Sequence, residues 1–83
     1  MRLHNILAKD FKILVFSSNI DAPEKVKLAK NELLKTEGIY RANIDLDDNE
    51  NVLRVECHPD CSPNIIEEQV ARLGFKSSEF RDY

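Results

Sequence analysis

Residues 39–58 read IYRANIDLDDNENVLRVECH, and this stretch decides the fold. Apolar side chains recur at every second position in residues 39–46 and again in residues 52–58, which is typical of strands with one buried face. The polar residues 47–51 between them favour a turn, so the stretch predicts a β-hairpin. The side chains expected on the buried face are Ala42, Ile44, Leu46, Leu53, Val55 and Cys57.

The segment before the hairpin predicts a strand followed by an amphipathic helix. Residues 11–16 (FKILVF) form a short apolar run of β-branched and aromatic side chains, as buried strands do. Asp21 is expected to cap the helix, because Glu24 stands three residues further on and Pro23 falls within the first turn. Gly38 is expected to end this helix in a left-handed conformation.

The segment after the hairpin predicts a second helix and a last strand. Ser62 and Pro63 are typical of an N-cap and the first helical residue. Apolar residues then recur with a helical period until Gly74, which is expected to stop the helix. Residues 75–80 predict a weaker, final strand.

The expected order, β-α-β-β-α-β, is that of a ferredoxin-like α+β fold. Right-handed crossovers then give a four-stranded antiparallel sheet with strand order 4-1-3-2 and both helices on one face. A length of 83 residues suits one domain, which we assign to residues 11–83 after an N-terminal arm of residues 1–10. The fold leaves the function open, because many unrelated activities use it.

Charge and cysteine content exclude several classes of function. Twelve basic and fifteen acidic side chains give a formal net charge of −3, so there is no basic excess to bind nucleic acid. No run approaches the roughly 20 apolar residues of a membrane span, and polar residues within 1–10 argue against a secretion signal. Two cysteines are too few for a disulfide scaffold, so we expect a cytoplasmic protein.

Five short motifs stand out along the chain: Gly38-Ile39, Ala42-x-Ile44-Asp45-Leu46, Val52-x-x-Val55, Ser62-Pro63-x-Ile65-Ile66 and Leu73-Gly74-Phe75. Together they resemble the heavy-metal-associated domain family, which comprises small copper chaperones and the N-terminal domains of metal-pumping ATPases. The resemblance covers residues 11–80 and implies a ferredoxin-like fold. In that family a Met-x-Cys-x-x-Cys loop after the first strand grips Cu(I) between two thiolates, a ligand pair that suits a soft cation.

The ligands of that loop are replaced in this chain. Aligning the motifs puts Ile20 at the methionine, Ala22 at the first cysteine and Lys25 at the second, so the chain resembles a degenerate, copper-chaperone-like member. The Lys25 ammonium has no lone pair and repels a cation. Phe75 falls where bacterial members carry a tyrosine beside the metal. We therefore predict that these four positions, together with the acidic turn at residues 45–50 at the same end of the sheet, form a surface that binds a protein partner.

A second candidate site is Cys57-His58-Pro59-Asp60-Cys61, expected at the other end of the sheet. Two thiols and an imidazole predict affinity for Cu(I) or Zn(II), and His4 in the arm could reach the same end. Two other interpretations stay open. In the first, Cys57 is a small core residue and Cys61 is a loop thiol. In the second, the two cysteines form a reversible disulfide, which requires their Cα atoms to lie within about 7 Å.

Catalysis is not expected. Acylphosphatases share the fold but need an arginine-bearing phosphate cradle, whereas residues 17–23 contain no arginine or glycine and include an acidic residue and a proline. A cysteine nucleophile would need a base, and His58 points to the opposite face of the strand from its neighbour Cys57.

The sequence as a whole predicts a small, non-catalytic binding module linked to metal transport or homeostasis, with no cofactor. Its expected partner is a protein, either a metal transporter or a second copy of the chain paired through a strand edge. Nucleic acid and membrane insertion are not expected. The alternative is a Cu(I)- or Zn(II)-binding carrier that uses Cys57, His58 and Cys61.

Overall fold

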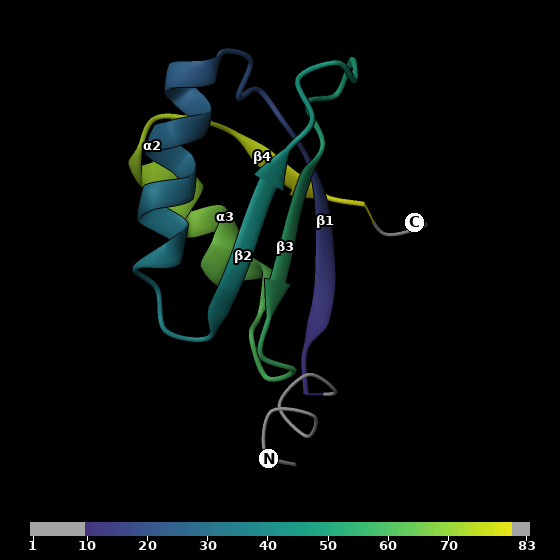
Figure 1. Cartoon of the computed structure of the whole chain (residues 1–83), viewed down its shortest axis with the longest axis vertical. Helices are drawn as coiled ribbons and strands as arrows, with labels where there is room; N and C mark the ends of the chain where they lie inside the picture. Colours follow the sequence, from purple (N-terminus) through teal and green to yellow (C-terminus); the bar gives the residue numbers. More distant parts are fainter. Residues whose placement is uncertain (1–9, 81–83) are drawn as a thin grey trace, which may run out of the picture.

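A four-stranded antiparallel sheet with two helices packed against one face makes up the protein (Figure 1). The computed structural model describes residues 10–80, so the predicted arm, apart from its last residue, lies outside the described residues. The elements are β1 (Lys12–Ser18), α2 (Pro23–Leu34), β2 (Ile39–Ile44), β3 (Leu53–Cys57), α3 (Pro63–Arg72) and β4 (Ser77–Glu79).

The strand order is β2-β3-β1-β4, which confirms the predicted ferredoxin-like topology. The two central strands, β1 and β3, pair along five residues with Leu14 opposite Val55. Strand β4 pairs with β1 only from Phe16 to Ser18, so it is a short edge strand. The register of β2 against β3 shifts between Ile39 and Arg41, where the edge strand is irregular.

The core lies between the helices and the sheet face that they cover. In the hairpin, Ala42 of β2 and Leu53, Val55 and Cys57 of β3 are buried at alternate positions, as the period of two predicted. In β1 the three consecutive residues Leu14, Val15 and Phe16 are buried. The largest completely buried side chains are Phe16, Ile20, Leu33, Leu53, Ile66, Val55, Val70 and Cys57. Burial of this apolar surface is the main force that holds so short a chain together.

One hairpin residue departs from the prediction. Leu46 was expected on the buried face, but its side chain is 38% exposed, because β2 ends at Ile44. The chain turns at Asp45, whose carboxylate accepts a hydrogen bond from the backbone N–H of Asp47 at 3.0 Å. The backbone of Asp45 still pairs with Val52 across the hairpin, with an N–O distance of 2.9 Å.

The first helix also begins and ends differently from the prediction. The N-cap residue is Ala22, and no side chain caps the helix, so the predicted role of Asp21 as the cap was wrong. Helix α2 ends at Leu34 with a right-handed C-cap at Lys35. Gly38 does adopt a left-handed conformation, with φ at 91°, but in the turn that leads into β2. The helix therefore stops before the glycine that was expected to end it.

The second helix matches the prediction closely. The hydroxyl of Ser62 accepts a hydrogen bond from the backbone N–H of Asn64 at 3.2 Å, and Pro63 is the first helical residue. Helix α3 ends at Arg72, and Gly74 follows with φ at 92°. The last strand is shorter than predicted, because the backbone N–H of Phe75 still bonds to the C=O of Val70 as the helix ends.

Candidate functional site

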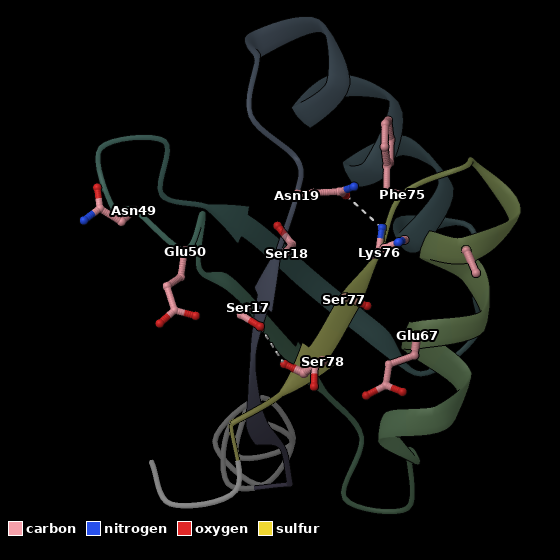
Figure 2. Close-up of a pocket in the computed structure, with 11 residues that line it drawn as sticks. Ser17, Ser18, Asn19, Asn49, Glu50, Glu67, Phe75, Lys76, Ser77 and Ser78 are labelled. Atoms are coloured by element: carbon pink, nitrogen blue, oxygen red, sulfur yellow. Dashed lines mark hydrogen bonds between the residues drawn. The ribbon is translucent and has the colours of Figure 1, made fainter.

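Three segments that are distant in the sequence meet at one end of the sheet. The β1–α2 loop, the β2–β3 turn and the residues before β4 lie together, as predicted for the acidic turn (Figure 1). The backbone N–H of Ser18 donates to the C=O of Glu50 at 2.9 Å, and that of Asn19 donates to the C=O of Lys76 at 3.1 Å. The side-chain oxygen of Asn19 accepts a hydrogen bond from the Lys76 N–H at 2.8 Å, drawn in Figure 2.

The apolar residues of the predicted protein-binding surface are largely buried, so they hold the loop against the core and offer little surface to a partner. Ile20 is completely buried in the core, and its N–H donates to the Ser18 hydroxyl at 3.2 Å. Ser18 in turn donates to the C=O of Asn51 at 2.7 Å, which joins the loop to the hairpin. Phe75 is partly buried against the core, and Ala22 is partly buried at the start of α2. Ile20 thus holds the loop in place and exposes no surface to a partner.

Lys25 forms an ion pair with Asp21 across the first turn of α2. Its Nζ atom lies 2.7 Å from Oδ1 of Asp21, and both side chains are exposed to solvent. The hydrogen bond and the positive charge of Lys25 lower the pKa of Asp21. The same contact raises the pKa of Lys25. The pair thus places a compensated positive charge where the resemblance puts the second thiolate.

The acidic turn uses its carboxylates to shape its own backbone. Asp45 accepts from the N–H of Asp47, and Asp48 accepts from the N–H of Glu50 at 2.8 Å. All residues from 45 to 50 are exposed. No group of three or more His, Cys, Asp or Glu side chains within residues 10–80 is arranged to hold a metal ion.

A shallow groove between the β1–α2 loop, the hairpin turn, α3 and β4 was not predicted (Figure 2). Its most regular feature is two serine pairs, because Ser17 and Ser18 on β1 stand opposite Ser78 and Ser77 on β4. The Ser77 hydroxyl is buried and has no hydrogen-bond partner within residues 10–80. The repeated Ser-Ser pair was the available signal, but the register that joins the pairs is not evident from the sequence. The lining residues are Ser17, Ser18, Asn19, Asn49, Glu50, Glu67, Ala71, Phe75, Lys76, Ser77 and Ser78.

The two cysteines meet at the opposite end of the sheet. Cys57 is completely buried at the end of β3, opposite Lys12 of β1. Cys61 lies in the loop between β3 and α3, as expected of a loop thiol, but it is 8% exposed and belongs to the core. Burial, together with the smaller effect of the neighbouring Cys61 thiol, raises the pKa of Cys57 to about 12.

His58 is not assembled with the two thiols. Its side chain is about half exposed, and Nδ1 accepts a hydrogen bond from the backbone N–H of Asp60 at 3.0 Å. That contact turns one ring nitrogen toward the turn and away from the core. His4, the other imidazole considered for this end, lies outside the described residues.

No protein-family model and no curated protein matches the chain. Solved structures do match it, and they bear the names of metal-binding or metal-transport proteins. The N-terminal domain of a potential copper-translocating P-type ATPase from Bacillus subtilis aligns with a TM-score of 0.74 and 21% identity, over 83% of this chain and 86% of that domain. Oxidized MerP from Ralstonia metallidurans CH34 aligns with a TM-score of 0.74 and 15% identity, over 86% of this chain and 99% of MerP.

A third match is the yeast copper transporter domain CCC2A, with a TM-score of 0.73 and 17% identity over 86% of this chain and 97% of that domain. These structures have the same fold as this chain, and the resemblance noted in the sequence is confirmed at the level of fold. At identities this low, the shared fold does not transfer the binding residues. Within residues 10–80, no helix has the length and apolar character needed to cross a membrane.

Proposed function

We propose that the protein is a non-catalytic interaction module of metal-ion homeostasis that works in the cytoplasm. Its fold is that of a copper-binding P-type ATPase domain and of MerP, which supports the link to metal handling. The family's two loop thiols are replaced by Ala22 and Lys25. In this proposal the loop end binds a protein and does not bind a metal ion.

The ion pair between Lys25 and Asp21 is the observation that carries the proposal. The 2.7 Å contact holds a positive charge at the start of α2, beside the position where relatives would hold a cation. A charge built into the chain keeps the loop in one shape without a metal ion. The binding surface is then permanent, and metal loading does not switch it.

The charges at this end favour a partner with a basic contact region. Exposed carboxylates outnumber the exposed ammonium groups of Lys25 and Lys76. A cytoplasmic segment of a metal transporter is the partner that the fold suggests, and a second copy of the chain stays an alternative prediction. The exposed carboxylates are those of Asp21, Glu24, Asp45, Asp47, Asp48 and Glu50.

Charge reversal at Lys25 tests the proposal. The full chain is used as bait, captured proteins are identified by mass spectrometry, and affinity is then measured with the purified partner. We expect Lys25→Glu to weaken binding by roughly tenfold or more, because it breaks the ion pair with Asp21 that holds the loop in its binding shape, and this loss outweighs the attraction of one more carboxylate for a basic partner. Lys35→Glu is the matched control, since Lys35 is exposed at the other end of α2. Equal affinity for both variants and the wild type would contradict the proposal.

The metal-carrier alternative, which uses Cys57, His58 and Cys61, stays a prediction with its own test. An anaerobic competition titration with Cu(I) and Zn(II) compares the wild type with Cys57→Ser/Cys61→Ser and His58→Ala. Binding by the wild type that is lost in both variants would favour a carrier. The exposed position of His58 gives no support to a three-ligand site.

A further inference from the structure

The two thiols at the far end of the sheet are brought together by a tight turn. The backbone N–H of Cys61 donates to the C=O of His58 at 2.9 Å, which folds the chain back directly after β3. Cys61 therefore returns to the core beside Cys57, and both side chains belong to one hydrophobic cluster. The Cys61 thiol contributes to the raised pKa of Cys57, an effect that only a nearby group has. Both cysteines are free thiols in the structure.

The two thiols differ in their access to solvent. Cys61 lines a surface hollow between the turn before β2, the turn after β3 and the first turn of α3. Cys57 does not line it and has no exposed surface. A small reagent that enters from solvent thus meets Cys61 first. The residues around the hollow are Glu37, Gly38, Tyr40, His58, Asp60, Cys61 and Ile65.

The apolar surroundings of Cys57 and Cys61 favour an uncharged state of the two sulfur atoms over a negatively charged one. The core of the described residues contains no buried polar or charged side chain. Cu(I) held by two thiolates would leave a negative charge in this apolar cluster, where charge is costly without a close counter-ion. Zn(II) needs four ligands, and within residues 10–80 no group of three or more His, Cys, Asp or Glu side chains is arranged to hold a metal ion. A disulfide carries no charge and leaves the sulfur atoms in apolar contact. The turn that brings the two cysteines together and the apolar environment around them therefore both favour a disulfide.

We propose that Cys57 and Cys61 form a thiol–disulfide couple in which Cys61 reacts first and Cys57 completes the disulfide. The oxidant is a low-molecular-weight disulfide of the glutathione type. The Cys61 thiolate attacks one sulfur of the reagent, forms a mixed disulfide and releases one thiolate, which takes up a proton. The Cys57 thiolate then attacks the Cys61 sulfur, forms the internal disulfide and releases the second thiolate. Two protein thiols are oxidised and one reagent disulfide is reduced to two thiols.

The test equilibrates the full chain, without oxygen, in glutathione buffers of increasing oxidised fraction. The reaction is quenched with acid, free thiols are alkylated, and intact masses are recorded. For the wild type we expect the doubly alkylated species to be replaced by an unlabelled species. The mass of this species is lower by two hydrogens than that of the reduced chain before alkylation. Cys57→Ser should accumulate one glutathione on Cys61, because the second attack is no longer possible. Cys61→Ser should react with glutathione disulfide at least roughly tenfold more slowly than Cys57→Ser, because its remaining thiol is buried.

Each alternative result contradicts the proposal. A wild-type chain that keeps both thiols across the whole series has no such couple, and one that accumulates the glutathione adduct has no completing thiol. Equal rates for the two single variants would refute the order of attack. Circular dichroism checks that the variants are folded, with Cys57→Ala as a second form of the buried change. The wild-type result decides the pairing even if a variant fails to fold.

Discussion

The Lys25 ammonium lies 2.7 Å from the Asp21 carboxylate and joins the end of the β1–α2 loop to the first turn of α2. The two residues are four apart, a spacing at which side chains on a helix meet. Asp21 is thereby drawn away from the capping role that its position suggested. The backbone at Ala22 takes that place without a side-chain hydrogen bond. An internal pair of opposite charges thus closes the β1–α2 loop.

The ion pair predicts a low pKa for Asp21. We expect the carboxyl of Asp21 to titrate below its ordinary value, because the hydrogen bond and charge of Lys25 favour the ionised form. The group then stabilises the fold at pH values above about 4, and this contribution is lost as the pH falls through the lowered pKa. Carboxyl chemical shifts followed by nuclear magnetic resonance measure this value. Lys25→Met should return it toward the ordinary value and Lys35→Met should not.

Introducing two thiols into the loop should create a metal-binding site. In Ala22→Cys/Lys25→Cys the new thiols occupy the N-cap and first turn of α2, where the helix dipole favours thiolates. We expect one Cu(I) per chain, measured by anaerobic competition with a chromogenic chelator. The control, Ala22→Ser/Lys25→Ser, removes the same ion pair without adding a soft ligand. Affinity no higher than that of the control would mean that the loop has lost the backbone shape as well as the ligands.

Ile20 should matter for stability and not for direct contact. Truncation of this completely buried side chain in Ile20→Ala is expected to lower the free energy of unfolding by about 2–5 kcal/mol. Ile65→Ala is the matched control, since Ile65 is 39% exposed, and its effect should stay below about 1 kcal/mol. Urea unfolding followed by circular dichroism gives both values. A small effect at Ile20 would show that the loop is not anchored through the core.

The buried Cys57 thiol predicts a loss of stability at alkaline pH. Its pKa is raised to about 12, so the folded chain keeps the proton at pH values where the unfolded chain has released it. The contribution of the protonated Cys57 thiol to the stability of the fold is complete below about pH 9 and declines as the pH rises toward 12. Unfolding midpoints measured from pH 8 upward should therefore fall more steeply for the reduced wild type than for Cys57→Ala. Parallel curves would place Cys57 in a more polar environment than the structure shows.

Local sequence rules predicted α3 correctly and α2 only in outline. Ser62 caps α3 as expected, and its hydroxyl accepts a hydrogen bond from the helix N–H of Asn64. Asp21 had a competing partner in Lys25, and the charged contact prevailed over the cap. A cap is predictable when its only partner is the helix, and it becomes unpredictable when a neighbouring charge offers a stronger bond.

The sequence alone predicts the order of the elements, the absence of thiols from the first loop and, except at Leu46, the buried face of the hairpin. Periodicity and residue identity decide these features, because each depends on neighbours within one turn or one strand. Only the tertiary structure decided that Ile20 is an anchor, that Ser18 of β1 stands opposite Ser77 of β4, and that Cys61 returns to the core beside Cys57. These features depend on strand register and on how a turn closes, which are set by the packing of the whole core and not by any local pattern.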